Sequence, residues 1–320
     1  MASNYSTGSV TSFPDLLGAL STFLVANGWT LTTGTGTNRI YAKAGTVVRF
    51  YTIATVGAAG LYLIGATGIS GAATTGDASA AVKIGSNAPT LVNFPATYEF
   101  AINDTPDEVY INLQYGGNKV QHLHFGKSDI PDIGGTGGWF GGSMSVAAVI
   151  PRVFTQFSDI SVATGFSGIG HGYFMSQVSS GLSFTFVHCG LEGADAWRVT
   201  GSGGPTTGQL IGVEYIAGLL RSLPSNFNES EVLLPIYGSM VRTDGTHTIV
   251  VALRHARYLR IDNVTPGDLI TYGPDRWKVH PLYAKSSAQR NGVPWDGSNS
   301  PTSGAEHSGT LGIALRYYGV

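Results

Sequence analysis

Short alternating runs of β-branched and aromatic residues dominate the sequence after Trp29, and turn residues separate them. The clearest pair, DEVYINLQY and KVQHLHFG, flanks Gly116, Gly117 and Asn118, which accept the positive φ angles of a tight turn. This pair predicts a β-hairpin. A chain composed mainly of such units is expected to be a β protein.

The same pattern predicts further strands on both sides of this hairpin. In the first half the predicted strands cover residues 39–43, 47–55, 60–66, 97–103, 108–115 and 119–126. In the second half, VLLPIYGSMVRT and THTIVVALRHA flank the hairpin signal Asp244-Gly245. The runs ARYLRIDNV, DLITYG, RWKVHPLYA and LGIALRYYGV predict the remaining strands.

One segment has helical rather than alternating spacing. In SFPDLLGALSTFLVANGW the apolar residues recur at steps of three and four, which predicts a helix over residues 13–27. Ser12 is a suitable N-cap, and Asn27-Gly28 supplies the left-handed exit common at helix ends. A second, shorter helix is predicted over residues 213–223.

These elements indicate a mainly β fold with an N-terminal helix (α+β), with β-sandwich or barrel-like domains and long Gly-rich loops. The 45 glycines have no three-residue period, so they indicate turns rather than collagen. The Gly-, Ser- and Thr-rich interval 199–208 suggests a boundary between a domain at 1–200 and a domain at 201–320. The polar stretch 285–309 is expected to be an extended arm that becomes ordered on another subunit.

The composition restricts the possible partners. Charged residues make up 12% of the chain, about half of the roughly 25% usual in soluble domains, so its surface is poorly protected against association. We expect neighbouring copies to cover that surface. The net charge of -2, with basic residues clustered only over 254–260, gives no indication of nucleic-acid binding.

Cysteine use and the N-terminal segment give two further expectations. The single cysteine, Cys189, excludes an intramolecular disulfide framework and multi-cysteine zinc motifs, which favours synthesis in a reducing cytoplasm. The apolar run from Leu16 to Val25 has no preceding Lys or Arg and is too short to span a bilayer. We therefore expect neither secretion nor a membrane partner.

Two histidines in HLHFGKSD could chelate a metal. His122 and His124 share one face of the predicted strand with Val120, and Asp129 follows shortly afterwards as a possible third ligand. Gly126 leaves Asp129 without a defined position, and histidines in strands more often make ordinary hydrogen bonds. We expect this histidine face to meet a neighbouring subunit rather than to hold a metal.

No other constellation predicts catalysis. The string that begins at Gly165 lacks the spacing of a nucleophile elbow, and the glycine run 134–138 lacks the lysine of a phosphate-binding loop. His188 and Cys189 are adjacent, so they point to opposite faces of a strand. No pair stands out among Glu99, Asp104, Asp107, Glu108, Glu192 and Asp195. We expect no catalytic residue and no cofactor.

Three aromatic residues are the candidates for interface contacts. Trp139 and Phe140 lie in the glycine-rich segment 130–146, which is predicted to be a long loop, and Trp295 lies in the 285–309 arm. Such side chains bury a large area and suit protein or sugar surfaces.

Three stretches resemble virion structural proteins of tailed bacteriophages. They are SNYSTGSVTSFPDLLGALSTFLVANGWT, then YGGNKVQHLHFGKSD with GGWFGGS, and finally YLRIDNVTPGDLITYGPDRWKVHPLYAKSSAQRN. The resemblance implies a particle component of the neck, collar, tail or baseplate that works as a symmetric homo-oligomer. The segment IPDIGGTGG departs from the pattern because it has fewer aromatic residues, which weakens any partner contact inferred for that loop.

Composition and resemblance together favour a non-enzymatic structural component of the virion. It would form a homo-oligomeric ring at the neck, collar or tail and contact itself and other virion proteins through edge strands and the 285–309 arm. The alternative is a receptor- or carbohydrate-binding module of a tail fibre or baseplate tip. A third possibility is a metal- or carboxylate-dependent hydrolase.

Overall fold

The structure is a computed structural model, and it describes most of the chain. The described residues are 3–55, 58–85, 92–117, 119–145, 173–174, 185–191, 193–199, 210–211, 231–261, 263–282, 285 and 311–319. The predictions for Trp295, for the helix at 213–223, and for all of the 285–309 arm except Lys285 lie outside these residues. So does the interval 199–208 apart from Val199.

The predicted N-terminal helix is confirmed as α1 (Phe13–Ala26). The Ser12 hydroxyl accepts a hydrogen bond from the Asp15 backbone N–H at 3.2 Å, which satisfies one of the free donors of the first turn. Asn27 ends the helix, and its backbone N–H donates to the Leu24 carbonyl. One apolar face is buried, including Leu16, Leu20 and Leu24.

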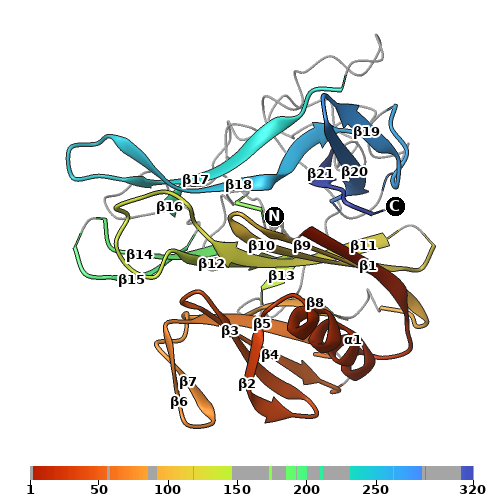
Figure 1. Ribbon diagram of the computed structural model, residues 1–320, viewed down its shortest axis with the longest axis horizontal. Helices are drawn as coiled ribbons and strands as arrows, with labels where there is room; N and C mark the ends of the chain where they lie inside the picture. Colours follow the sequence, from red (N-terminus) through yellow and green to blue (C-terminus); the bar gives the residue numbers. More distant parts are fainter. Residues whose placement is uncertain are drawn as a thin grey trace, which may run out of the picture.

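The described strands form three large sheets, and Figure 1 shows them stacked as layers. The central sheet has the order β1 (Ser3–Val10), β9 (Ala96–Asp104), β10 (Asp107–Tyr115), β11 (Lys119–Lys127), β12 (Gly138–Gly142), β14 (Thr185–Cys189) and β15 (Ala196–Val199). The N-terminal sheet has the order β13 (Met144–Ser145), β8 (Val82–Gly85), β5 (Gly60–Ala66), β4 (Thr46–Ile53), β3 (Asn38–Lys43) and β2 (Thr30–Thr35).

The C-terminal sheet has the order β16 (Leu210–Ile211), β17 (Leu234–Val241), β18 (His247–Arg260), β21 (Leu311–Arg316), β20 (Asp275–Pro281) and β19 (Leu269–Tyr272). A small hairpin of β6 (Gly68–Ser70) and β7 (Ala73–Thr75) extends from the N-terminal sheet. Within the described residues the fold is therefore mainly β with one helix, near the N-terminus as predicted, and its stacked sheets are sandwich-like.

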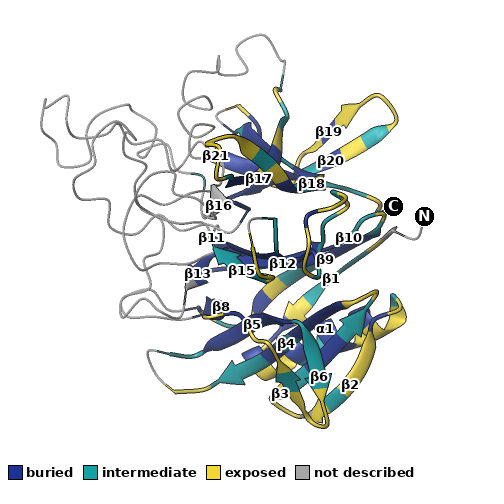
Figure 2. Cartoon of the chain, turned by 90° about the vertical axis from the view of Figure 1, so that its left-hand side faces the viewer, coloured by how far each residue is buried: buried dark blue, intermediate teal, exposed yellow. Residues whose placement is uncertain are grey.

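Two apolar cores separate the three layers. The first contains residues of α1, the N-terminal sheet and one face of the central sheet, and it includes Phe50, Leu113 and Phe125. The second lies between the other face of the central sheet and the C-terminal sheet, and it includes Trp139 and Leu253. Burial deepens toward the central sheet in Figure 2, because that sheet is covered on both faces.

The predicted hairpin explains how two-sided burial is compatible with an alternating sequence. β10 and β11 pair in the register Ile111 with Leu123, and Gly116 and Gly117 both have positive φ in the turn between them. The apolar side chains Val109 and Ile111 enter the first core. The polar side chains alternate with them and point to the C-terminal sheet, so they are buried instead of solvated.

The prediction of a long loop over residues 130–146 is wrong in its second half. β12 pairs there with β11 and β14 in the middle of the central sheet. The glycines provide space for large side chains on neighbouring strands. A Cβ atom on Gly126 would lie 2.7 Å from Trp139, and one on Gly142 would lie 2.6 Å from Leu123. Glycine here permits close packing and does not indicate a flexible loop.

Several other elements differ from the expected pattern. β1 and β2 are not predicted, because SNYSTGSV and TLTTGT are polar and lack an apolar face. The predicted strands THTIVVALRHA and ARYLRIDNV merge into the single strand β18, whose pairing with β17 contains two register shifts. β15, the last strand of the central sheet along the chain, ends at residue 199, and β16, the first strand of the C-terminal sheet, begins at residue 210. Separate domains at 1–200 and 201–320 stay a prediction.

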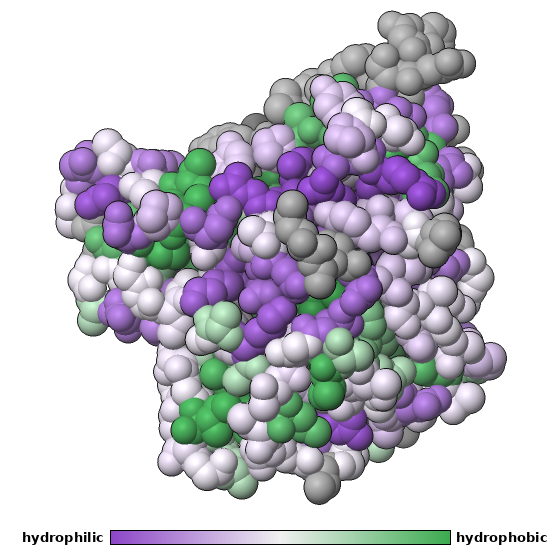
Figure 3. All heavy atoms as spheres, in the orientation of Figure 1, coloured by the Kyte–Doolittle hydropathy of each residue, from purple (hydrophilic) through white to green (hydrophobic). Residues whose placement is uncertain are grey.

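Strongly hydrophilic residues are unevenly distributed over the visible surface. In Figure 3 strongly hydrophilic residues gather where the central and C-terminal sheets meet, whereas the layer containing α1 is paler and greener.

α1 has 14 residues, and no helix among the described residues has the length and apolarity needed to cross a bilayer.

Candidate functional site

The central sheet directs a set of polar side chains at the C-terminal sheet, and we call this set the inter-sheet polar face. It consists of Glu99 on β9, of Glu108, Tyr110 and Asn112 on β10, and of His122 and His124 on β11. Except for Glu99, these residues are at most 4% exposed. Buried polar groups are costly without hydrogen-bond partners, so the contacts of each one indicate what the face does.

His122 connects the central sheet to the end of β20. Its Nε2 lies 3.0 Å from the Pro281 carbonyl oxygen and 3.1 Å from that of Leu282, and its Nδ1 lies 2.7 Å from Oδ1 of Asn112. Burial, together with the nearby His280, lowers the pKa of His122 to about 3. The imidazole is therefore neutral at pH 7. A neutral ring has one N–H, so it can donate either to Asn112 or to the backbone carbonyls of β20 and Leu282, but not to both sides.

His124 is held by Tyr173. Its Nε2 accepts a hydrogen bond from the Tyr173 backbone N–H at 2.8 Å, and the two rings stack with their centroids 4.0 Å apart. Burial lowers the pKa of His124 well below its usual value, and the His122 ring contributes to the shift. Because Nε2 accepts the amide N–H, the proton of the neutral ring is on Nδ1.

The geometry does not place His122 and His124 as a metal-binding pair. The strand register puts them on one face as predicted, but the Nε2 atom of each is engaged with the protein backbone. Asp129, the suggested third ligand, binds the Arg254 guanidinium with contacts of 2.8 and 3.3 Å. Among the described residues, no group of three or more His, Cys, Asp or Glu side chains could hold a metal ion.

The expectation that the histidine face meets another subunit is also wrong. That face is covered by the C-terminal sheet of the same chain, through Pro281 and Leu282, and by Tyr173. The sequence could not reveal this because the covering strand follows more than 150 residues later.

Glu108 attaches the central sheet to β18. Its carboxylate accepts hydrogen bonds from the Tyr110 hydroxyl at 2.6 Å and from the backbone N–H groups of Arg254 and His255 at 2.7 and 2.9 Å. Burial raises the pKa of Glu108 to about 7, although these donors and the nearby Arg257 act in the opposite direction. A buried carboxylate with three donors is a strong but pH-sensitive link between layers.

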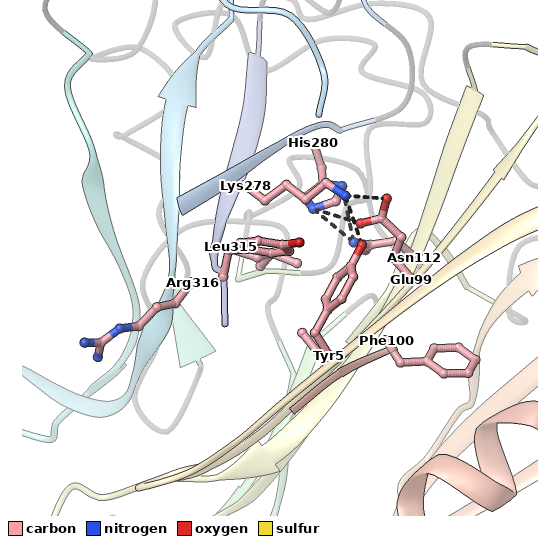
Figure 4. Close-up of a pocket in the computed structure, with 10 residues that line it drawn as sticks. Tyr5, Glu99, Phe100, Asn112, Lys278, His280, Leu315 and Arg316 are labelled. Atoms are coloured by element: carbon pink, nitrogen blue, oxygen red, sulfur yellow. Dashed lines mark hydrogen bonds and ion pairs between the residues drawn. The ribbon is translucent and has the colours of Figure 1, made fainter. Parts of the chain in front are cut away.

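Glu99, Lys278 and Tyr5 form a second link at the edge of the same face, shown in Figure 4. The Lys278 ammonium donates to Glu99 Oε1 at 2.8 Å and to the Tyr5 hydroxyl at 2.9 Å. His280 Nε2 lies 3.8 Å from Glu99 Oε2. Lys278 and His280 both come from β20, where they are two residues apart and therefore lie on the same face of the strand.

The pKa values in this second link show which contact is an ion pair. Burial would raise the pKa of Glu99, but the charge that His280 carries when protonated, and the hydrogen bonds from Lys278 and Tyr5, outweigh burial and lower it. Burial lowers the pKa of His280 to about 4, so its imidazole is neutral at pH 7. The charged partner of Glu99 near neutral pH is therefore Lys278.

A groove of about 370 Å³ lies beside this link. Its lining consists of Glu99, Gln114, Gly117 and Val120 from the central sheet, with residues 265–267, residues 278–281 and Lys285 from the other side. The ammonium of Lys278 is paired with Glu99, and that of Lys285 donates to the Val264 carbonyl at 2.8 Å. These described lining residues include no Trp, Tyr or Phe ring on which a sugar could stack. A smaller cavity of about 10 Å³ lies among Tyr5, Asn112 and Leu315 (Figure 4).

The remaining described candidates for chemistry have structural contacts, and Glu192 lies outside the described residues. Cys189 is fully buried with its Sγ 3.8 Å from Sδ of Met240, and burial raises the pKa of its thiol. His188 Nδ1 accepts from the Thr136 backbone N–H on the opposite face. Among the carboxylates, Asp104 and Asp107 both pair with Lys43, at 3.0 and 2.8 Å, at the turn between β9 and β10.

Two of the three predicted interface aromatics are buried within the chain. Trp139 is 1% exposed and belongs to the second core, and Phe140 is fully buried in the first. Trp139 and Phe140, which are adjacent in β12, thus pack into opposite cores. Neither side chain reaches the surface, so neither can form the predicted interface.

Sequence reasoning missed several residues that complete these contacts. Lys278 and His280 had a usable signal, because RWKVHPLYA alternates and places both on one face. Tyr173 had none, since its neighbours in the sequence do not have a strand or helix pattern. Its hydroxyl lies 3.4 Å from His122 Nδ1, and its backbone carbonyl accepts the Tyr258 hydroxyl.

Comparison with known proteins adds no relative. No family model matches the sequence, and no curated protein matches it either.

Proposed function

We propose that this chain is a non-enzymatic structural component of a tailed bacteriophage particle and assembles as a homo-oligomer at the neck, collar or tail. One observation carries most of the weight. The polar side chains that would be considered for chemistry are used to fasten one layer of the chain to the next.

The way these side chains are used favours a mechanical role. Glu108 has three hydrogen-bond donors, and the Nε2 atoms of His122 and His124 contact backbone groups. A general base or nucleophile needs an accessible lone pair close to a substrate position. Side chains occupied in this way instead resist separation of the sheets, which is what a particle component under mechanical stress requires.

The low charge supports assembly rather than an isolated existence. With 18 basic and 20 acidic residues in 320, few charges keep neighbouring copies apart. Exposed apolar side chains are present as well, and Tyr272 on β19 is 73% exposed. Such a surface is suited to contacts with other proteins.

The receptor-binding alternative is weaker because two of its three aromatic candidates are buried. Trp139 and Phe140 cannot stack on a sugar from inside the two cores. The hydrolase alternative loses its proposed metal pair, since Nε2 of each histidine already contacts the backbone.

Mass spectrometry and electron microscopy of purified particles test the proposal. Particles of the phage that encodes this chain should contain it at a fixed copy number, and antibody labelling should place it at the neck, collar or tail. Absence of the chain from purified particles, while it is present in the lysate, would overturn the structural role.

A further inference from the structure

Among the described strands, β1 is a long sheet edge whose sequence lacks the usual protection against further pairing. Edge strands of soluble proteins carry charged residues, prolines or bulges, or are kept very short, because their free backbone groups can pair with another strand. β1 has the sequence SNYSTGSV, with neither charge nor proline. It pairs with β9 without a register shift from Ser3–Asn103 to Val10–Ala96.

The other edges of the three large sheets are less suitable. β13 and β16 have two residues each, and β15 and β19 have four. β2 has six residues, but its pairing with β3 is shifted between Leu31 and Thr33. Among the strands that the structure describes, β1 is therefore the longest regular edge.

β1 has exposed residues along its length and is held in place by its neighbours. In an antiparallel sheet about half of the residues of an edge strand direct both N–H and C=O away from their neighbour. Asn4, Thr7 and Ser9 are exposed, and β1 runs along the front of the central sheet in Figure 1. Tyr5 holds the strand through Lys278 and through an edge contact with Tyr317.

We propose that β1 pairs with β1 of a second copy of this chain, antiparallel and about a two-fold axis, so that two central sheets join into one. This inference rests on the proposed function, and it identifies the contact through which two copies of the chain would associate. A strand without charge can face its own copy without repulsion, and Ser, Thr and Asn pairs across strands are favourable. A two-fold contact closes on itself, so it would give the pair of chains from which a larger ring is built.

A cysteine scan over residues 4–9 tests the geometry of this pairing. In a two-fold antiparallel pair one residue faces its own copy at roughly 4.5–5.5 Å between Cα atoms, within disulfide reach. Mild oxidation should give a cross-linked product of twice the 33.5 kDa chain mass, with a maximum at one position. The native Cys189 is buried, and Thr271→Cys on β19 is the matched edge control. No cross-linking along β1, or equal cross-linking at Thr271, would overturn the pairing.

A charge on the edge tests the energetics. Thr7→Lys should halve the mass measured by light scattering, because lysines at symmetric positions would repel and need hydration. Thr271→Lys should leave the mass unchanged, and thermal unfolding should show that both variants are folded. A wild-type chain that stays monomeric at high concentration, or a Thr7→Lys chain with unchanged mass, overturns the pairing.

These outcomes are separate from the test of the proposed function. If purified particles contain the chain but Thr7→Lys keeps its mass, the function stands and the β1 contact is overturned. If the chain pairs through β1 in solution but is absent from particles, the contact stands and the particle role is overturned.

Discussion

Individual polar residues determine how the layers of this protein hold together. Glu108, His122 and Lys278 each connect the central sheet to the C-terminal sheet through contacts of 2.7 to 3.0 Å. Such groups stabilise a structure only while every partner is present, because a buried donor or acceptor left alone is costly. Their effect is therefore visible mainly when one of them is changed.

Replacing Glu108 should expose that dependence. In Glu108→Gln the side chain keeps its shape, but its amide NH₂ faces backbone N–H donors that the carboxylate accepted. We expect a loss of about 2–3 kcal/mol in the free energy of unfolding, measured by urea denaturation at pH 7.5. Asp244→Asn, in an exposed turn, should leave the free energy of unfolding close to that of the wild type. Similar losses for the two variants would contradict the role given to Glu108.

The buried histidines should make stability fall in acid. Folded-state pKa values are about 3 for His122 and about 4 for His255 and His280, because burial disfavours the charged ring. Below pH 6.5 these histidines bind protons in the unfolded chain but stay neutral in the folded chain. The free energy of unfolding should therefore decrease between pH 6.5 and pH 4.

Glu108 should oppose this trend. Its folded-state pKa is about 7, above the usual 4.5, so the folded chain binds the extra proton between these values and gains stability as the pH falls. Three histidines outweigh one carboxyl group, and Glu108→Gln should make the decrease in acid steeper. A free energy of unfolding that rises from pH 6.5 to pH 4 in the wild type would show that the histidines are not buried neutral.

At the scale of elements, the close packing of β11 and β12 depends on glycine. Gly126 lies beneath Trp139 and beside the Asp107 carbonyl, and a Cβ atom there would lie 2.2 Å from that oxygen. Gly18 is different, since it lies in the middle of α1 and a Cβ atom there would have nothing within 4 Å. The same substitution should therefore have opposite effects at the two sites.

Gly18→Ala should stabilise the protein by about 0.5–1 kcal/mol, because alanine loses less conformational freedom in a helix. Gly126→Ala should destabilise it by more than about 2 kcal/mol through overpacking. Thermal unfolding of both variants beside the wild type measures the difference. Equal shifts in the same direction would contradict the packing described for β12.

The elements also show what the sequence could predict. Alternation and turn residues are enough for α1 and for the β10–β11 hairpin, because both depend on neighbouring residues. They do not predict β1, because its stability comes from pairing with β9, some ninety residues away in the chain. They predict a loop at β12 because glycine usually breaks strands. In the structure, glycine instead makes room for the bulky Trp139 side chain of a paired strand, and the sequence does not show this tertiary contact. The partners of His122 are unpredictable for the same reason.

At the scale of the whole molecule, the central sheet unites the other two layers. Each of its faces belongs to a different core, and the second core contains residues from both the central and the C-terminal sheets, such as Trp139 and Leu253. Neither outer layer keeps its full core if the central sheet is lost.

We therefore expect one cooperative unfolding transition. Calorimetry of the full chain should give a single heat-absorption peak whose van't Hoff and calorimetric enthalpies agree. Two well-separated peaks would instead support independent domains at 1–200 and 201–320.

The order in which the chain is synthesised gives the polar face of the central sheet a further role. Glu108, His122 and His124 emerge from the ribosome long before β21 (Leu311–Arg316), which completes the sheet that covers them. Until then this surface is in contact with water. An apolar surface in that position would attract other nascent chains, whereas carboxylate and imidazole groups hydrate well and leave it soluble. We therefore expect the side chains that later fasten the layers together to make this face less prone to aggregation than its apolar residues, such as Trp139, would be alone.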